Sequence, residues 1–300
     1  MERTGERGLA LISVLWLMLL LSLMLGAVLT TARVGVKMSG AAAQHVEAAT
    51  IAEAGVNRAI LGLLNDNRSQ RWQPDGRPHN FQFAGRTVKI SVTDEAGKFD
   101  LNAAADELLD RLFQSAGLSP EDSARLVDAI GDWRDPDDLR RLNGAEAGTY
   151  RSAGLDYGPR NGPFEVVSEL RQVLGMTDEL YRCVEPALTL HSGRRTADSR
   201  VAPAPVKKAL GLREDHTTGA PTASGGPGVV AMAGSLGGRA FTIRAEVAIP
   251  DSAPLLREAT IRITENPREP YWILSWGGGR SNQSHATELC EKQLNRLAMN

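Results

Sequence analysis

The feature that most constrains this chain is an uncharged stretch near its N-terminus. Residues 9–32 contain no Asp, Glu, Lys or Arg, and their only polar side chains are two serines and two threonines. At 1.5 Å per residue, about 20 apolar helical residues cross a hydrocarbon core about 30 Å thick. A charge at the centre of that core would cost about 3 kcal/mol or more. The sequence therefore predicts a membrane-spanning helix over residues 9–32.

Three kinds of N-terminal segment compete for this stretch. A secretory signal has a shorter apolar centre and a small-residue cleavage site after it. A plain signal anchor spans the membrane uncut. A pilin-type leader is cut after a glycine that precedes the apolar run, so the helix stays in the mature protein. Arg7-Gly8 followed by Leu9 fits this third order, and we expect cleavage between Gly8 and Leu9.

The apolar pattern continues beyond the predicted span as one face of a helix. Apolar residues recur every three or four positions, at Val46, Ala49, Val56, Ile60 and Leu63. No proline occurs before Pro74. A helix over residues 9–64 would be about 85 Å long. We interpret it as a pilin-like stalk whose second half packs on the body of the protein.

Alternating apolar residues predict strands on both sides of a long interruption. The first alternation covers residues 86–93, paired with a short strand at 81–83, and others follow at 241–249, 259–263 and 271–276. Hairpin spacing of the last three indicates an antiparallel meander. We therefore predict an α+β, pilin-like fold: a long N-terminal helix packed on an antiparallel sheet that a helical insert interrupts.

The predicted insert contains two pairs of short helices with similar turns. Helices are expected at residues 103–116 and 120–133, and again at 166–173 and 177–188. Asn102 is the expected N-cap of the first helix, and Ser119-Pro120 is a typical start for the second. These pairs resemble helix-hairpin-helix or SAM-like units. The predicted divisions are a leader (1–8), transmembrane helix (9–32), stalk and first strands (33–96), insert (97–190), Pro/Gly-rich linker (191–238) and C-terminal sheet (239–300).

The charge of the insert argues against nucleic-acid binding. Residues 94–190 carry 20 acidic against 10 basic side chains, a net charge of −10, although the whole chain has a net charge of only −2. Phosphate binding depends on positive charge, since counterion release supplies most of the affinity. We therefore predict no nucleic-acid partner.

An acidic run marks the sharpest candidate site. Asp135, Asp137, Asp138 and the later Glu146 crowd hard oxygen ligands on one predicted loop, which suits calcium. The spacing is not that of an EF-hand, because the required glycine position holds Arg140. The alternative is a solvated loop whose carboxylates pair with nearby arginines.

Catalysis finds little support in the sequence. The five histidines are scattered, and no Gly-x-Ser-x-Gly, His-Glu-x-x-His or phosphate-binding glycine loop occurs. We predict that the protein is not an enzyme. Cys183 and Cys290 are either separate buried thiols or, if the body lies outside the cytoplasm, a disulfide.

Several segments resemble the general secretion pathway protein K family, the largest minor pseudopilins of type II secretion systems. The similarity runs nearly from end to end and is most specific in the insert. It is carried by Arg7-Gly8 before Leu9-Ala10-Leu11, by Asp94-Glu95-Ala96-Gly97-Lys98-Phe99-Asp100-Leu101-Asn102, by Asp132-Trp133-Arg134-Asp135-Pro136-Asp137-Asp138, by Asn161-Gly162-Pro163-Phe164 leading into Val167-Ser168-Glu169-Leu170, and by Tyr271-Trp272-Ile273-Leu274-Ser275-Trp276.

The resemblance implies a non-catalytic tip subunit of the periplasmic pseudopilus, assembled with the minor pseudopilins I and J beneath the outer-membrane secretin. It implies cleavage by the prepilin peptidase, N-methylation of Leu9, and a single-pass inner-membrane protein with a periplasmic body. Ser13 replaces the glutamate found at the fifth mature residue of most pilins, which fits a tip position. Calcium binding in the insert is also implied. The alternative is a membrane-anchored periplasmic module that recognises secreted proteins.

Overall fold

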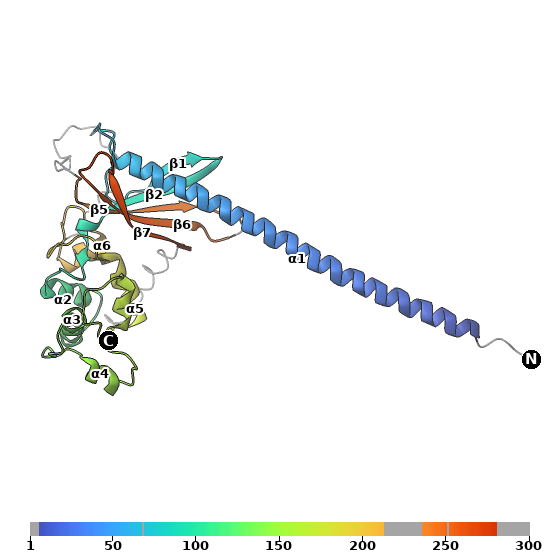
Figure 1. Ribbon diagram of the computed structural model, residues 1–300, viewed down its shortest axis with the longest axis horizontal. Helices are drawn as coiled ribbons and strands as arrows, with labels where there is room; N and C mark the ends of the chain where they lie inside the picture. Colours follow the sequence, from blue (N-terminus) through green and yellow to red (C-terminus); the bar gives the residue numbers. More distant parts are fainter. Residues whose placement is uncertain (1–5, 68, 213–235, 251, 281–300) are drawn as a thin grey trace, which may run out of the picture.

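The computed structural model describes residues 6–67, 69–212, 236–250 and 252–280, with the side chains of residues 6–11, 27–37 and 279–280 left out. A long helix lies along one face of an antiparallel sheet, and a helical insert projects from the sheet (Figure 1). The free end of the helix points away from the insert. The predicted α+β fold class is confirmed.

The stalk helix α1 (Glu6–Leu63) is continuous. Its last turns bury small and branched side chains against the sheet, namely Ala48, Ile51, Ala52, Val56, Ala59, Ile60 and Leu63. Gly55 allows a close approach, because a Cβ there would lie 2.7 Å from Val88 Cγ1 and 3.1 Å from Ala245 Cβ. The helix predicted from hydrophobic spacing is therefore present, and its second half packs as expected.

The sheet contains five antiparallel strands in the order β1-β2-β5-β6-β7. Their bounds are β1 His79–Phe83, β2 Arg86–Asp94, β5 Ala240–Val247, β6 Leu255–Ile263 and β7 Tyr271–Arg280. The β1–β2 turn has positive φ at Ala84 and Gly85, 49° and 73°, as a tight hairpin turn requires. The insert leaves after β2 and the chain returns at β5.

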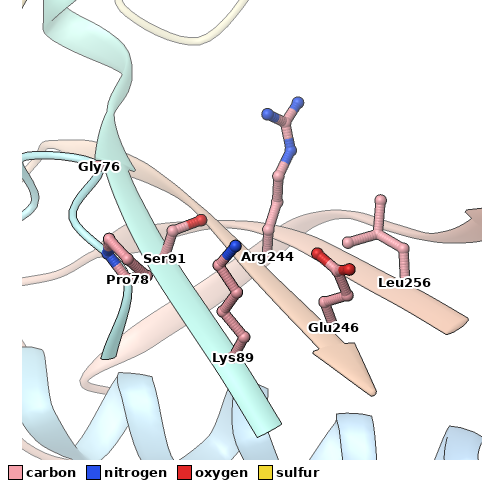
Figure 2. A pocket seen from close by; sticks show the side chains of 7 residues that line it. All are labelled: Gly76, Pro78, Lys89, Ser91, Arg244, Glu246 and Leu256. Carbon is pink, nitrogen blue, oxygen red and sulfur yellow. The ribbon is translucent and has the colours of Figure 1, made fainter. Parts of the chain in front are cut away.

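The two faces of the sheet differ in polarity. Val88, Ile90 and Val92 are fully buried towards α1. The alternate residues of β2 point to the opposite face, where Lys89 lies beside Glu246 and Arg244 in a shallow polar pocket (Figure 2). The period-2 alternation in the sequence thus separates the stalk side from a polar side.

The insert has its own hydrophobic core. Its helices are α2 Asp106–Ser115, α3 Pro120–Arg134, α4 Ala147–Ser152, the 3₁₀ helix Val167–Gln172 and α5 Asp178–Val184. A further helix, α6 (Ala204–Ala209), follows the insert. The largest buried side chains of this core are Phe99, Phe113, Leu126, Ile130, Trp133 and Tyr150. The helix expected over 166–173 is a 3₁₀ helix. The one expected to reach residue 188 ends at Val184, because Pro186 lies where the next turn would form.

One predicted helix cap is wrong. The N-cap of α2 is Ala105, which makes no side-chain cap bond. Asn102 instead bonds twice to Phe164: its Nδ2 donates to the carbonyl oxygen at 3.0 Å and its Oδ1 accepts from the amide at 2.8 Å. These two bonds satisfy the backbone groups of Phe164, so the Asn102 side chain does not cap α2. Ser119 caps α3 as predicted, accepting from the Asp122 amide at 3.1 Å.

A short parallel ladder closes the insert. β3 (Phe99–Asp100) pairs with β4 (Leu188–Thr189). Each strand has two residues, too few for a periodic pattern, so the sequence did not predict them. Most of the predicted Pro/Gly-rich linker centre, 213–235, and the C-terminal segment 281–300 lie outside the described residues.

Candidate functional site

The acidic loop connects α3 to α4 within the insert. Helix α3 stops at Arg134 because Asp135 adopts extended backbone angles and precedes a proline. The loop ends at Glu146, whose backbone is the N-cap of α4 while its side chain makes no cap bond. The Glu146 carboxylate therefore lies near Asp132 and Asp135 at the end of α3, and it does not cap α4.

Several oxygens in this loop, and one in the segment after α4, are buried and lack a hydrogen-bond partner. They are Oδ1 of Asp135, both carboxylate oxygens of Glu146, and Oδ1 of Asn161. Nδ2 of Asn161 donates to Asp138 Oδ1 at 2.9 Å, which ties Asp138 to the same group. Buried polar atoms are satisfied in the great majority of cases, and an orphaned one costs about 1–3 kcal/mol. These oxygens can accept a hydrogen bond from a donor or coordinate a cation.

Asn161 holds its position at the cost of an unusual backbone conformation. Its φ is 53°, one of two positive φ values among the described non-glycine residues. Asparagine tolerates the left-handed region better than most residues. Asn161 is absent from the predicted ligand set because it lies 23 positions from Asp138 in the sequence.

Asp132 is a second member that the predicted ligand set missed. Its side chain is fully buried, and its Oδ1 accepts from the Arg141 amide at 3.1 Å. The loop closes tightly over it, since a Cβ at Gly144 would lie 2.1 Å from Asp132 Oδ2. The sequence signal for Asp132 was its position directly before Trp133, a large side chain that is buried.

Asp137 behaves differently from the other predicted ligands. It is exposed, and its Oδ1 accepts from the Leu139 amide at 2.8 Å in a local turn. The described residues thus place Asp135, Asp138 and Glu146 with Asp132 and Asn161, while Asp137 stabilises the loop backbone. Its part in metal binding stays a prediction.

Burial and mutual repulsion shift the acidities in this cluster. Burial raises the pKa of Asp132, Asp135 and Glu146 above their ordinary values. After burial, the largest causes for Glu146 are the neighbouring charges of Asp132 and Asp135. Like charges that share a site oppose ionisation. A bound cation would relieve this repulsion.

The arginines near the loop are mainly engaged elsewhere. Arg134 and Arg141 both pair with Asp106 at the start of α2, each at 2.7 Å. The closest approach between Arg141 Nε and Asp132 Oδ1 is 3.9 Å. Arg134 also donates to the Leu101 carbonyl at 2.8 Å. The alternative of a loop neutralised by its own arginines therefore leaves the orphaned oxygens unexplained.

The chemistry of the cluster suits a hard cation better than a transition metal. The orphaned atoms of Asp135, Glu146 and Asn161 are carboxylate or amide oxygens, the ligands that calcium accepts in flexible geometry. No three His, Cys, Asp or Glu side chains in the described ranges already converge closely enough to hold a metal ion. A cation bound here would therefore need ligands besides these carboxylates, such as the amide oxygen of Asn161.

A buried polar network joins the insert to the sheet. Asp94, at the end of β2, forms an ion pair with Arg239 and accepts from the Ala96 amide at 2.9 Å. Next to it, Glu95 pairs with Lys98 at 2.7 Å. Asp100 accepts from the Gly193 amide at 2.8 Å, across the return of the chain. The network ties both ends of the insert together and determines how the insert leaves the sheet.

His191 lies at the same junction and predicts a pH effect. Its carbonyl accepts from Arg262 at 3.1 Å, and burial lowers the pKa of its imidazole. The unfolded chain, with a pKa near 6.5, then binds the proton more readily than the folded chain. Stability from this group is fully present above pH 6.5 and is lost as the pH falls below it.

We expect His191→Gln to reduce the loss of melting temperature between pH 7.5 and pH 5.5, measured by circular dichroism. His45→Gln is the control, because His45 is exposed on α1. An equal loss in the wild type and in His191→Gln would contradict the prediction.

Cys183 in α5 is disulfide-bonded. The interpretation of two separate thiols is therefore wrong for Cys183. The sequence contains only one other cysteine, Cys290, which lies outside the described residues.

Known proteins match the chain most clearly in the insert. Residues 90–193 match the family model of type II secretion system (T2SS), protein K. Type II secretion system protein K of Klebsiella pneumoniae is 27% identical over 202 residues, which cover 60% of this chain and 61% of the relative. That of Dickeya chrysanthemi is 35% identical over 82 residues, 27% of this chain and 22% of the relative. The insert of this chain is therefore similar to type II secretion system protein K.

The match to protein K spans the whole candidate site. Residues 90–193 include the junction at Asp94, the acidic loop and Asn161. The predicted resemblance to the protein K family is confirmed. The chain spans about 61% of the length of the Klebsiella relative that it matches.

A solved structure confirms the fold. A chain of the crystal structure of the GspK-GspI-GspJ complex from enterotoxigenic Escherichia coli superposes with a TM-score of 0.59 at 17% identity. The superposition covers 81% of this chain and 99% of that one. The two chains therefore share a fold over the superposed part.

The structure describes the predicted cleavage site by its backbone alone. Residues 1–5 are not described, and the backbone at Gly8 and Leu9 belongs to α1. In the described part of the chain, no helical segment combines the length and apolarity that crossing a bilayer takes. Cleavage between Gly8 and Leu9 stays a prediction.

Proposed function

We propose that this chain is a non-catalytic minor pseudopilin at the tip of a type II secretion pseudopilus, where it helps to initiate and cap assembly for protein export across the outer membrane. The observation that carries the proposal is the shape in Figure 1. An elongated stalk helix suits side-by-side assembly, and a bulky insert between β2 and β5 crowds the opposite end. A subunit with such a head fits best where no further subunit follows.

The proposed partners follow from the relatives. The superposed Escherichia coli chain comes from a GspK-GspI-GspJ complex, and we propose the corresponding minor pseudopilins I and J as partners here. The prepilin peptidase, the secretin and secreted proteins complete the proposed set. Nucleic acid is left out because the insert is acidic.

We propose a single-pass inner-membrane location with the body in the periplasm. The large apolar side chains between Ile12 and Leu25 are 52–71% exposed on α1, an arrangement that water alone does not favour. N-terminal sequencing of membrane-extracted protein should begin at N-methylated Leu9. A chain that begins at Met1 or after residue 32 would contradict the leader.

The assembly role predicts a secretion defect on deletion. Without this subunit, we expect export of the secreted proteins to fall to background, while the inner-membrane platform and the other pseudopilins remain at normal levels. Full-length protein supplied from a plasmid is the control. Normal secretion of all substrates in the deletion strain would refute the role.

A second candidate function rests on one exposed feature of the acidic loop. Leu139 and Leu142 are 77% and 90% exposed there, which favours a membrane-anchored module that recognises secreted proteins. Capture of a secreted protein in the absence of pseudopilins I and J, lost in Leu139→Ser/Leu142→Ser, would support it. No capture would leave the assembly role as the sole candidate.

We further propose that the acidic loop binds calcium. Asp135, Asp138 and Glu146 would supply carboxylate oxygens, and Asn161 an amide oxygen, to a cation that offsets their repulsion. The proposal is supported by the orphaned oxygens and by the preference of calcium for such ligands. Elemental analysis of protein purified without chelator should find about one calcium per chain. No metal would contradict the site.

A further inference from the structure

β7 is an open edge of the sheet. It is the last strand in the order β1-β2-β5-β6-β7, and in the described part of the chain no strand pairs with its outer side (Figure 1). Residues 275–278 are all exposed, whereas the central strand β5 is buried along most of its length. The outer N–H and C=O groups of an edge strand can pair with a strand from another chain.

β7 lacks the usual features that prevent such pairing. Natural sheets protect open edges with prolines, lysines or very short strands. β7 is ten residues long and contains neither proline nor lysine. It exposes Trp272, Ile273 and Trp276 by 56%, 51% and 45%. A bulge at Leu274 interrupts the ladder with β6, so the regular part of the outer edge is residues 275–280.

Gly277 lies in this regular part, and neither its backbone nor its packing requires glycine. Its φ lies outside the left-handed region, and a Cβ there would have no described heavy atom within 4 Å. Its partner in β6, Glu258, forms an ion pair with Arg244 on β5, on the side away from the edge. The next glycine differs, because a Cβ at Gly278 would lie 2.0 Å from Nη1 of Arg257. Glycine weakens a strand, and often marks the close approach of another backbone.

The two faces of β7 specify the side chains of an added strand. Successive residues of a strand face opposite sides of the sheet. Trp276 lies on the α1 side, because it is opposite Ala259, which is buried with the α1 residues. Gly277 therefore lies on the polar side. An aromatic side chain on a neighbouring strand can cover an edge glycine, and an apolar one can pack beside Trp276.

We propose that residues 275–280 of β7 bind an extended segment of a different polypeptide as a sixth strand of the sheet, with an aromatic side chain of that segment over Gly277. Antiparallel pairing with β7 of a second copy would relate the copies by a two-fold axis perpendicular to the strands. Because α1 runs along the strands (Figure 1), the two stalks would then point in opposite directions. This step rests on the proposed function, since it takes both copies to be anchored in one membrane.

Gly277→Thr tests the proposal with two readouts that move in opposite directions. Threonine favours a strand and fills the space that the incoming aromatic side chain needs. The probe is the acetylated, amidated peptide Lys-Thr-Val-Tyr-Val-Thr-Lys, titrated into the full-length chain in detergent and followed by tryptophan fluorescence. We expect the melting temperature of Gly277→Thr to equal or exceed that of the wild type. Peptide binding should weaken about tenfold, the effect of losing one or two hydrogen bonds.

A variant and a modified peptide serve as controls. Gln82→Thr changes an exposed residue of β1 at the opposite edge of the sheet, and it should bind the peptide as the wild type does. The same peptide with two successive central amides N-methylated cannot pair along either side, and it should not bind. Equal binding of the two peptides, equal binding by Gly277→Thr and the wild type, or no binding by the wild type would each overturn the proposal.

Photo-crosslinking in cells locates the natural occupant. A photoreactive amino acid at position 276 should crosslink to an extended segment of another protein, identified by mass spectrometry. Crosslinks to a helix of a partner, to a second copy, or to residues 281–300 of the same chain would contradict the proposal. Peptide binding does not depend on export, so normal secretion in a deletion strain would refute the proposed function and leave the peptide result standing.

Discussion

Replacing Asp94 by Ala is expected to lower the free energy of unfolding by about 3–5 kcal/mol, the usual effect of removing one partner of a buried ion pair. Asp94 is 1% exposed and pairs with Arg239, which belongs to the return of the chain into β5. Burial raises the pKa of Asp94, while the Ala96 amide and Arg239 act against this. The carboxylate is therefore held by its partners against the cost of burial.

The loss should concern the junction between sheet and insert. Chemical denaturation followed by circular dichroism measures the stability, and limited proteolysis reports whether the insert is released first. Glu121→Ala is the matched control, because Glu121 and Arg125 form an exposed pair on α3. Such pairs contribute about 0.3–0.5 kcal/mol. An Asp94→Ala variant as stable as Glu121→Ala would show that the junction does not depend on this ion pair.

A double substitution separates the ion pair from simple loss of packing. If Asp94 and Arg239 act as a unit, Asp94→Asn with Arg239→Met should cost less than the sum of the single substitutions. An additive result would mean that each side chain acts through other contacts.

The second large effect is expected from calcium. At a free calcium concentration one hundred times the dissociation constant, binding to the folded chain adds about 2.7 kcal/mol. Chelation should therefore lower the melting temperature, and added calcium should restore it. An unchanged melting curve, together with no metal by elemental analysis, would remove the site.

Glu146→Gln gives the sharpest version of this test. In the metal-free protein it removes a buried charge that Asp132 and Asp135 repel, so we expect a higher melting temperature than that of the metal-free wild type. The same variant should lose the increase on calcium addition. Asp178→Asn is the control, because Asp178 at the start of α5 pairs with Arg171 of the 3₁₀ helix Val167–Gln172, outside the loop. A Glu146→Gln variant that keeps the calcium response would exclude Glu146 as a ligand.

The pH dependence of the metal-free protein follows from the same carboxylates. Because the pKa of Glu146 is raised in the folded state, the folded chain binds a proton more readily than the unfolded chain. The contribution of this group is then largest below the unfolded pKa and is lost as the pH rises through the folded value. Glu146→Gln should remove that slope, which has the opposite sign to the slope predicted for His191.

Local patterns were sufficient for the regular elements. The repeat along α1 and the alternation in β2, β5, β6 and β7 arise from which side of each element is buried, and both are visible in a short window. Ser119-Pro120 marks the start of α3 because capping involves residues three apart. These interactions lie within a few residues of one another, so the sequence carries them directly.

The candidate site was predictable only in part. The acidic run predicted Asp135, Asp137, Asp138 and Glu146 as ligands. It did not single out Asp132 or Asn161, whose places depend on how the loop folds over α3. Asn102 illustrates the same limit: a local rule assigned it to a helix cap, whereas its two bonds reach Phe164, 62 positions away. A partner so distant leaves no local signal.

The sequence by itself determined a long apolar-to-amphipathic helix, an antiparallel sheet and an acidic helical insert, because each depends on spacing along the chain. Only the tertiary structure decided that α1 packs on β2, β5 and β6, that Arg134 and Arg141 both pair with Asp106, and that Asp94 joins the insert to β5. These features depend on which distant surfaces meet. Burial, which sets the strength of charges and hydrogen bonds, exists only after those surfaces have packed.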